Sequence, residues 1–183
     1  MSTAVIEKKK STYEDYLKTP EDERYELIEG KLLMTPSPIP THQRISRKIE
    51  FILEKFVTEN DLGEIFYAPC DVYLNTENVV QPDILFISKE RLNIIGEKNI
   101  QGAPDLVIEI ISENSAYRDL VQKKRLYATF GVKEYWSVIP GEELIEIHIL
   151  KDDKYTLYNT YKKTDILEST YFKGLKINLE MIF

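Results

Sequence analysis

The sequence VVQPDILFIS, residues 79–88, places an acidic residue inside an apolar run. The run is typical of a strand with apolar residues on both faces, yet Asp83 lies in its middle, directly behind Pro82. A carboxylate that leaves water without a partner costs several kcal/mol or shifts its pKa until it is neutral. The stretch therefore predicts a buried strand and a partner for Asp83 that must come from elsewhere in the chain.

A second acidic residue lies in another apolar strand, PDLVIEIIS at 104–112. Glu109 is the only charge at the centre of this strand, which we expect to be central in a sheet because it is apolar on both faces. One buried acid alone is about as often a structural hydrogen-bond anchor as a functional group. Two carboxylates on neighbouring strands repel each other unless a divalent metal, a lysine or arginine, or a shared proton lies between them.

The helix that follows supplies a candidate cation. In SAYRDLVQKKRLYATFG (115–131), helical spacing puts Lys123 on a core-facing stripe made of Ala116, Leu120, Lys123, Tyr127 and Phe130. The outward face is expected to carry Arg118, Gln122 and Arg125. An i, i+4 surface pair with Asp119 is the alternative role for Lys123, but such a pair needs no core-facing stripe. We therefore expect Lys123 to reach back toward the strand of Glu109.

Length and composition bound the class of protein. The chain has 183 residues, of which 43% are hydrophobic and 30% charged, as in a single globular domain. We expect a short disordered lead-in at 1–10 and one domain at 11–183. The chain has no apolar stretch long enough to span a bilayer and its start lacks a signal-peptide pattern, which predicts a cytoplasmic protein without membrane contact. The single cysteine, Cys70, excludes an intrachain disulfide, and with only two histidines a zinc site of Cys/His type is not expected.

The first half of the chain predicts a hairpin, a long helix and a meander. A short helix in STYEDYLK (11–18) precedes a β-hairpin in RYELIEGKLLMTP (24–36), with Gly30 in its turn. A long helix is expected from Thr41, as N-cap, to Glu59, with an apolar stripe of Ile45, Ile49, Ile52, Leu53 and Phe56. EIFYAPCDVYLN (64–75) and VVQPDILFIS are each predicted as one strand, joined around 75–78.

The second half predicts a βαβ unit and a closing hairpin. The strand at 104–112, the helix at 115–131 and the strand VKEYWSVIP (132–140) follow one another in the order of a right-handed crossover. EELIEIHILKDDKYTLYNTY (142–161) predicts a hairpin that turns at Asp152 and Asp153. Together these elements predict an α/β fold with a mixed central sheet, helices on both faces and the core order αβββαβ, preceded by the N-terminal hairpin.

Two carboxylates on adjacent strands beside a lysine are the groups that metal-dependent phosphodiester cleavage requires. Carboxylate oxygens suit Mg²⁺, which polarises the scissile phosphate and lowers the pKa of a bound water, while a lysine orients that water or neutralises developing charge. Three other functions stay open. The chain could bind nucleic acid or a protein partner without cutting, act as a glycoside hydrolase without metal, or keep the acids as satisfied core groups of a structural scaffold.

The stretches QPDILF (81–86), PDLVIEIIS and RDLVQKKRLYATFGVKEYW (118–136) resemble the Uma2 family, DUF820, a branch of the PD-(D/E)XK nuclease superfamily. RYELIEGKLLMTPSPIPTHQRI (24–45) and GLKINLEMIF (174–183) are similar to that family too, so the resemblance covers nearly the whole chain. It implies a restriction-endonuclease-like fold and an endonuclease that uses Mg²⁺ or Mn²⁺ as cofactor. Nucleic acid, with DNA as the expected form, would be its substrate and partner.

The resemblance also assigns roles to single residues. Asp83 corresponds to the PD aspartate and Glu109 to the acid of the (D/E)XK element, and we expect both to hold the metal with the backbone carbonyl of Ile110. The lysine of that element is missing, because Ile111 occupies its place. The family is similar in this respect, with the lysine moved to the following helix, where it matches Lys123.

Three N-terminal residues are weaker candidates. Glu26 matches an acid that the family usually has, as an auxiliary ligand or a partner of the ligands, although a half-exposed hairpin acid makes a structural pair at least as often. His42 and Gln43 open the long helix, where backbone N–H groups favour a phosphate, whereas a cap or surface role is more frequent for such a histidine.

The net charge of −7 argues against a chain-wide basic surface. Two short basic runs, HQRISRK (42–48) and KKR (123–125), are local exceptions that solvated helix faces also produce. The acidic balance leaves weak nonspecific affinity, a partner protein, or a homodimer that creates a basic cleft as alternatives.

Overall fold

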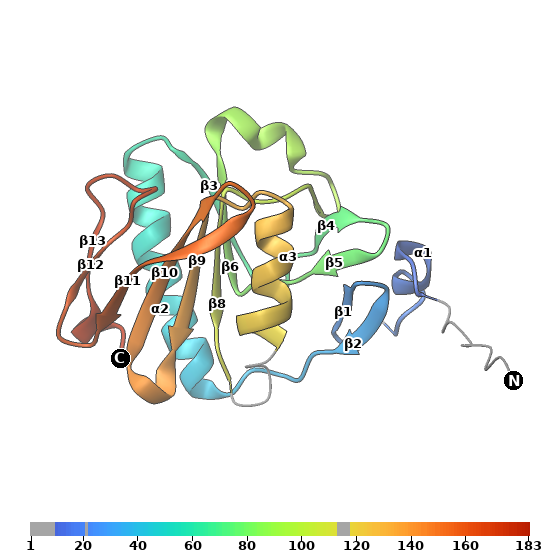
Figure 1. The fold of residues 1–183 in the computed structure, drawn as a ribbon, viewed down its shortest axis with the longest axis horizontal. Coiled ribbons are helices and arrows are strands. Elements are labelled where there is room, and N and C mark those ends of the chain that lie inside the picture. The colour runs from blue at the N-terminus through green and yellow to red at the C-terminus, as the bar shows by residue number, and fades with distance from the viewer. Residues whose placement is uncertain (1–9, 21, 113–117) are drawn as a thin grey trace, which may run out of the picture.

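The computed structural model describes residues 10–20, 22–112 and 118–183, and it shows a mixed α/β protein with two mixed sheets (Figure 1). The expected disordered lead-in at 1–10 falls almost entirely outside the described residues. None of the helices in the described part of the chain has both the length and the apolar content that crossing a membrane requires.

The larger sheet has six strands in the order β11-β10-β9-β8-β6-β3. These strands are β3 (Gly63–Tyr67), β6 (Ile84–Ser88), β8 (Leu106–Ile110), β9 (Glu134–Ile139), β10 (Leu144–Lys151) and β11 (Lys154–Lys162). β8 and β9 run parallel, and every other neighbouring pair is antiparallel. Asp83 directly precedes β6 and Glu109 lies within β8, and these two strands are direct neighbours.

The second sheet has five strands in the order β2-β1-β5-β4-β7. They are β1 (Tyr25–Ile28), β2 (Lys31–Met34), β4 (Val72–Asn75), β5 (Asn78–Val80) and β7 (Ile100–Gln101). β1 and β2 form the expected N-terminal hairpin, whose turn residues Glu29 and Gly30 both have positive φ, as a tight two-residue hairpin turn requires. A small third sheet pairs β12 (Ile166–Glu168) with β13 (Lys176–Asn178).

The expectation of a single central sheet is wrong at one point of the chain. The stretches 64–75 and 79–88 do not form one strand each, because both break and pass from the six-stranded sheet into the five-stranded one. Pro69 and Pro82 lie in the two breaks, and a proline cannot donate to a sheet ladder. The breaks lie side by side, since the Ala68 amide donates to the Asp83 carbonyl at 3.0 Å. Asp83 therefore lies at the junction of the two sheets.

Helices cover both faces of the six-stranded sheet, as predicted (Figure 1). The long helix α2 (Pro40–Glu59) packs its buried residues Ile45, Ile49, Leu53 and Val57 on one face. A π-helical segment, Arg118–Lys123, continues into α3 (Lys124–Thr129) on the other face, where Leu126 and Tyr127 are buried. Helix α2 begins one residue before the predicted N-cap Thr41, because Pro40 occupies the first helical position that proline favours.

The remaining helical elements are short. The N-terminal helix α1 spans Tyr13–Tyr16, and its N-cap amide, from Thr12, donates to the Asp15 carboxylate. Turns of 3₁₀ type occur at Lys89–Ile94, Pro140–Glu142 and Leu179–Met181. In the larger sheet the chain follows the order α2, β3, β6, β8, the helix at 118–129 and β9, which agrees with the predicted core order. The C-terminal hairpin turns at Asp152, as expected.

Glu134, at the start of β9, shows what a structural buried acid looks like in this fold. Its side chain is 1% exposed and accepts hydrogen bonds from the Trp136 indole (2.7 Å), the Ser169 hydroxyl (2.7 Å) and the Tyr171 amide (3.0 Å). The Thr170 amide (3.1 Å) and hydroxyl donate to it as well. The carboxylate thus ties the segment after β12 to the central sheet.

Glu134→Gln is expected to lower the free energy of unfolding by about 2–3 kcal/mol, because the amide replaces an acceptor oxygen with a donor that faces other buried donors. Urea denaturation followed by circular dichroism measures this change. Glu142→Gln, on an exposed turn, is the control and should stay within about 0.5 kcal/mol of wild type. Equal stability of the two variants would contradict the anchoring role.

Candidate functional site

Among the described residues, the Asp83 carboxylate contacts two groups from elsewhere in the chain, as its place in an apolar run predicted. Its Oδ2 accepts a hydrogen bond from the Ile110 amide (2.8 Å) and lies 3.1 Å from the imidazole Nε2 of His42. The side chain remains 17% exposed, so the carboxylate is bound by these two groups and is still accessible from solvent. His42 comes from the first turn of α2, so the histidine predicted at this helix start lies beside Asp83.

Asp83 and Glu109 lie opposite each other on neighbouring strands. In the antiparallel pair of β6 and β8, Ile84 is opposite Ile108, and extension of this register by one residue places Asp83 opposite Glu109. Directly opposite residues of an antiparallel pair project to the same face. That face is the one covered by α3. Leu85 and Val107 lie two residues from Asp83 and Glu109 and so point to the same face, where they pack with Tyr127.

Glu109 is buried, with its side chain 3% exposed, and its Oε1 has two donors. The Lys123 ammonium lies 2.6 Å away, and the Tyr127 hydroxyl donates at the same distance of 2.6 Å. Burial raises the pKa of Glu109 well above its usual value; Lys123 opposes this rise, and the carboxylates of Asp119, Asp83 and Glu26 add to it. A further positive charge next to Glu109 would therefore stabilise its ionised form.

Lys123, the predicted lysine, is buried, with 2% of the residue exposed. Its Nζ lies 2.6 Å from Glu109 and 2.8 Å from Glu26, with Asp119 farther away at 3.7 Å. Burial by itself would lower the pKa of Lys123, but the surrounding carboxylates outweigh burial and hold the pKa well above its usual value. Lys124 points elsewhere, since its Nζ lies 2.6 Å from Nε2 of His148. Of the two lysines, Lys123 is therefore the one that faces Glu109, as the helical stripe predicted.

Glu26 is more deeply buried than a hairpin acid was expected to be. Only 1% of the residue is exposed, and its carboxylate accepts a hydrogen bond from the Gln81 amide (2.9 Å) besides pairing with Lys123. The expectation of a half-exposed residue is wrong because β1 is an interior strand, with β2 on one side and β5 on the other. The second sheet therefore contributes directly to the site.

Arg118 was expected to point outward, and this prediction is wrong. Its side chain is 16% exposed and its Nε lies 3.7 Å from Glu26. The cause is local, because residues 118–123 form wider π-helical turns, which change the directions expected from α-helical spacing. Arg125 does point outward and pairs with Glu29 at the surface. Ala116, the first member of the predicted stripe, lies outside the described residues.

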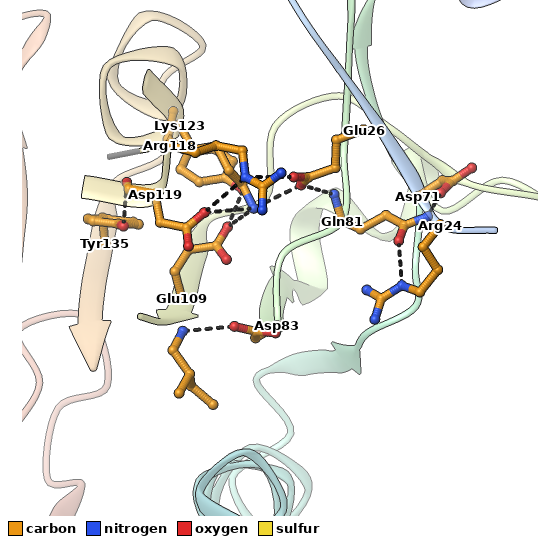
Figure 2. Close-up of polar contacts among 12 residues, drawn as sticks. Arg24, Glu26, Asp71, Gln81, Asp83, Glu109, Arg118, Asp119, Lys123 and Tyr135 are labelled. Atoms are coloured by element: carbon orange, nitrogen blue, oxygen red, sulfur yellow. Dashed lines mark hydrogen bonds and ion pairs between the residues drawn. The ribbon is translucent and has the colours of Figure 1, made fainter. Parts of the chain in front are cut away.

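Glu26, Asp83, Glu109, Arg118 and Lys123 all line one cavity of about 480 Å³. The carboxylates of Glu26, Glu109 and Asp119 converge on Lys123 and Arg118, and Asp83 lies at the adjacent wall, as Figure 2 shows. Further lining residues that the sequence did not single out are Arg24, Gln81 and Ser112. The predicted Gln43 is exposed and lines a neighbouring hollow instead.

The donor set fits a hard divalent cation. Within the described ranges, no three or more His, Cys, Asp or Glu side chains are grouped so that they could hold a metal ion. Mg²⁺ needs no such group, since it binds through one or two carboxylates and keeps several waters. The cavity is lined by the four carboxylates of Glu26, Asp83, Glu109 and Asp119 and by three basic side chains, those of Arg24, Arg118 and Lys123. Negative charge is in excess, which a cation between Asp83 and Glu109 would offset.

Comparisons with known proteins agree with this architecture. A model of the Uma2 family, described as "Putative restriction endonuclease", matches residues 12–180. The fold is similar to the crystal structure of "a putative nuclease belonging to DUF820" from Anabaena variabilis, with a TM-score of 0.78 and 20% sequence identity over 94% of this chain and 97% of that one. No curated protein matches the sequence. At such identity the structural likeness shows the fold, whereas the family match spans nearly the whole sequence. The chain belongs to the Uma2 family.

Proposed function

We propose that this protein is a metal-dependent endonuclease that hydrolyses phosphodiester bonds in nucleic acid, with DNA as the expected substrate. One observation carries the proposal: Asp83 and Glu109 lie opposite each other on adjacent strands, beside the buried ammonium of Lys123, in the wall of one cavity. The family's description as a restriction endonuclease supports it. So does the position of Asp83 between two sheets, where a substrate can approach its open side.

Asp83 and Glu109 would hold Mg²⁺ or Mn²⁺, with the backbone carbonyl of Ile110 as the third protein ligand. When bound there, such an ion would supply Lewis-acid chemistry, polarising a phosphoryl oxygen and lowering the pKa of water. The protein's part is to fix the two carboxylates. The Ile110 amide and the His42 imidazole orient Asp83, and the Tyr127 hydroxyl orients Glu109.

Lys123 would stabilise the charge that develops on the phosphate. A preorganised donor aimed at developing charge acts strongly in a site that excludes water, because it needs no reorganisation during the reaction. Lys123 meets this description, since it is buried, positively charged and fixed between Glu109 and Glu26. Glu26 in turn accepts a hydrogen bond from the backbone amide of Gln81, two residues before Asp83. The segment from Gln81 to Asp83 therefore both positions Glu26 and carries Asp83.

A scaffold role for these acids is less well supported than catalysis. The fold contains satisfied core acids, and they look different from the cavity acids. Asp105 is fully buried and pairs with Lys133 and Arg91, and Glu134 has donors all around it. Neither lines the cavity, whereas Asp83, Glu109 and Glu26 all do. A glycoside hydrolase needs one carboxyl free to protonate a leaving group, and Glu109 is instead paired with Lys123.

Calorimetric titration with Mn²⁺, followed by incubation of supercoiled DNA and of RNA with the protein in Mg²⁺, Mn²⁺ or EDTA, tests the proposal. We expect one bound ion per chain and cleavage only in the presence of the divalent metal. Metal binding without cleavage of any nucleic acid would favour the alternative, a nuclease-fold protein that binds nucleic acid or a protein partner. Absence of metal binding would contradict the proposed function.

A further inference from the structure

A second hollow of about 330 Å³ adjoins the first cavity. The two share four lining residues: Arg24, Pro38, His42 and Asp83. The outer hollow continues from Asp83 along the first turns of α2 and past the end of β3, where it is lined by Gln43, Ser46, Arg47, Glu50, Tyr67 and Ala68. Asp83 therefore lies within a continuous groove, a shape that suits an extended polymer.

Arg24 lies where the two hollows meet, and it is half-buried. Its Nε donates to the Gln81 side-chain oxygen (3.1 Å), and the Gln81 amide group donates to Asp71 (2.8 Å). Figure 2 shows the terminal nitrogens of the guanidinium on the side facing away from Gln81, with no dashed line to the cluster around Lys123. No acidic side chain in the described ranges forms an ion pair with Arg24.

An arginine that is fixed in a cavity wall without a carboxylate partner is suited to bind a phosphate. The guanidinium presents several donors in one plane, which match two phosphate oxygens at once, and it stays charged at any relevant pH. Among the described residues, Gln81 holds Arg24 through Nε and no side chain binds its terminal nitrogens, which are therefore available to a ligand. Gln81 also positions Glu26, which links this arginine to the proposed catalytic side chains.

Two further side chains extend the pattern along the outer hollow. Arg47 is exposed on α2 and, among the described residues, likewise forms no ion pair. Tyr67, at the end of β3, is 61% exposed and lines the same hollow. Exposed aromatic rings beside basic side chains are how proteins bind nucleic-acid strands, with the base stacked on the ring and the backbone on the cations.

Building on the proposed function, we infer that the outer hollow is a subsite for a nucleotide next to the scissile phosphate, with its backbone phosphate on Arg24 and Arg47 and its base on Tyr67. Glu50 limits where the phosphate can lie. It is eight residues beyond His42 on α2, or about 12 Å along the helix, so it lines the far end of the hollow. A carboxylate there suits an amino group of a base rather than a phosphate, which places the phosphate between Arg24 and Arg47 rather than beside Glu50.

Binding of fluorescent oligonucleotides, single- and double-stranded, tests this subsite by fluorescence anisotropy in EDTA over a series of NaCl concentrations. Without metal, binding is measured apart from cleavage. Arg24→Ala and Arg47→Ala should each raise Kd about 3- to 10-fold at low salt and reduce the slope of log Kd against log salt by about one. Arg44→Ala is the matched control, because Arg44 is exposed on the same helix but lines neither hollow.

Tyr67→Ala gives an independent readout. Loss of stacking should raise Kd about 5-fold or more without a change in the salt slope, since no charge is removed. Tyr158→Ala, at an exposed tyrosine on β11, is its control and should leave Kd unchanged. Equal effects of Arg44→Ala and Arg47→Ala, unchanged binding by Arg24→Ala and Arg47→Ala, or no oligonucleotide binding by the wild type would each overturn the subsite.

Failure of the subsite and failure of the proposed function give different results. If the wild type cleaves with Mg²⁺ while the arginine and tyrosine variants bind as the wild type does, only the subsite is wrong. If binding depends on Arg24, Arg47 and Tyr67 but no metal supports cleavage, the subsite is supported and the nuclease proposal fails.

Discussion

Lys123→Ala is expected to lower the rate of metal-dependent cleavage by at least about 10²-fold, because it removes the buried donor proposed to meet the developing charge on the phosphate. The same substitution should not weaken Mn²⁺ binding, since the ammonium and the metal compete for Glu109. Cleavage rates at saturating Mn²⁺, together with calorimetric affinities, separate these two effects. A variant that binds metal but does not cut is the signature of a catalytic lysine that is not a ligand.

Lys124→Ala is the matched control for Lys123→Ala. The two lysines are adjacent in sequence, yet Lys124 reaches His148 and lies outside the cavity. Its removal should leave the cleavage rate close to that of wild type, because no proposed catalytic group contacts it. If Lys124→Ala lost activity while Lys123→Ala kept it, the role assigned to the buried lysine would be wrong.

Lys123 also contributes to stability, which a second variant must take into account. Removal of one partner of a buried ion pair typically destabilises a protein by about 3–5 kcal/mol, because the other charge stays buried without compensation. In Lys123→Ala both Glu26 and Glu109 lose their ammonium partner. Lys123→Met fills the same space without the charge, and Mn²⁺ should restore part of the lost stability in either variant. Circular dichroism before each assay shows whether the variant is folded.

The pairing of Asp83 with Glu109 could be predicted from the sequence because strand periodicity is local. Each acid interrupts a short apolar run, and runs that are apolar on both faces belong to the interior of a sheet. Lys123 could be predicted for the same reason, because it precedes the buried Tyr127 by one helical turn. These inferences need only the immediate neighbours of each residue.

Two prolines in the sequence indicate the division into two sheets. Pro69 and Pro82 each interrupt a stretch that otherwise reads as one strand, and a proline in a central strand argues against that assignment. The breaks move β4 and β5 into the second sheet and bring β1 against β5. Burial of Glu26 follows from that pairing, which involves residues about 50 positions apart and has no local signature.

The position of Arg118 could not be predicted for a different reason. A helix read at 3.6 residues per turn assigns every side chain a direction, and one widened segment changes the assignments before it. Residues 118–123 are π-helical, so Arg118 turns toward Glu26, whereas the α-helical part after Lys123 keeps the predicted phase at Tyr127. Errors of this kind concentrate at functional sites, where local regularity is given up for placement of a side chain.

Asp83→Asn is expected to reduce Mn²⁺ affinity by at least about 100-fold, because loss of an outer partner of a metal ligand alone costs about 10- to 100-fold and Asp83 is proposed as a direct ligand. Metal-dependent cleavage should fall below detection as a consequence. The asparagine oxygen can still accept the hydrogen bond from the Ile110 amide, so the junction of the two sheets should keep its geometry. Calorimetric titration with Mn²⁺ and the plasmid assay measure both changes.

Asp119→Asn is the control that separates ligation from general electrostatics. It removes one negative charge from the wall of the same cavity, 3.7 Å from Lys123, but Asp119 is not among the proposed metal ligands. Its effect on Mn²⁺ affinity should stay below about 10-fold, the size expected for a nearby charge in a partly solvated site. Similar losses in Asp83→Asn and Asp119→Asn would mean that the cavity attracts cations through its net charge alone. A loss confined to Asp83→Asn would identify the carboxylate that the proline break places at the open junction as the group that binds the ion.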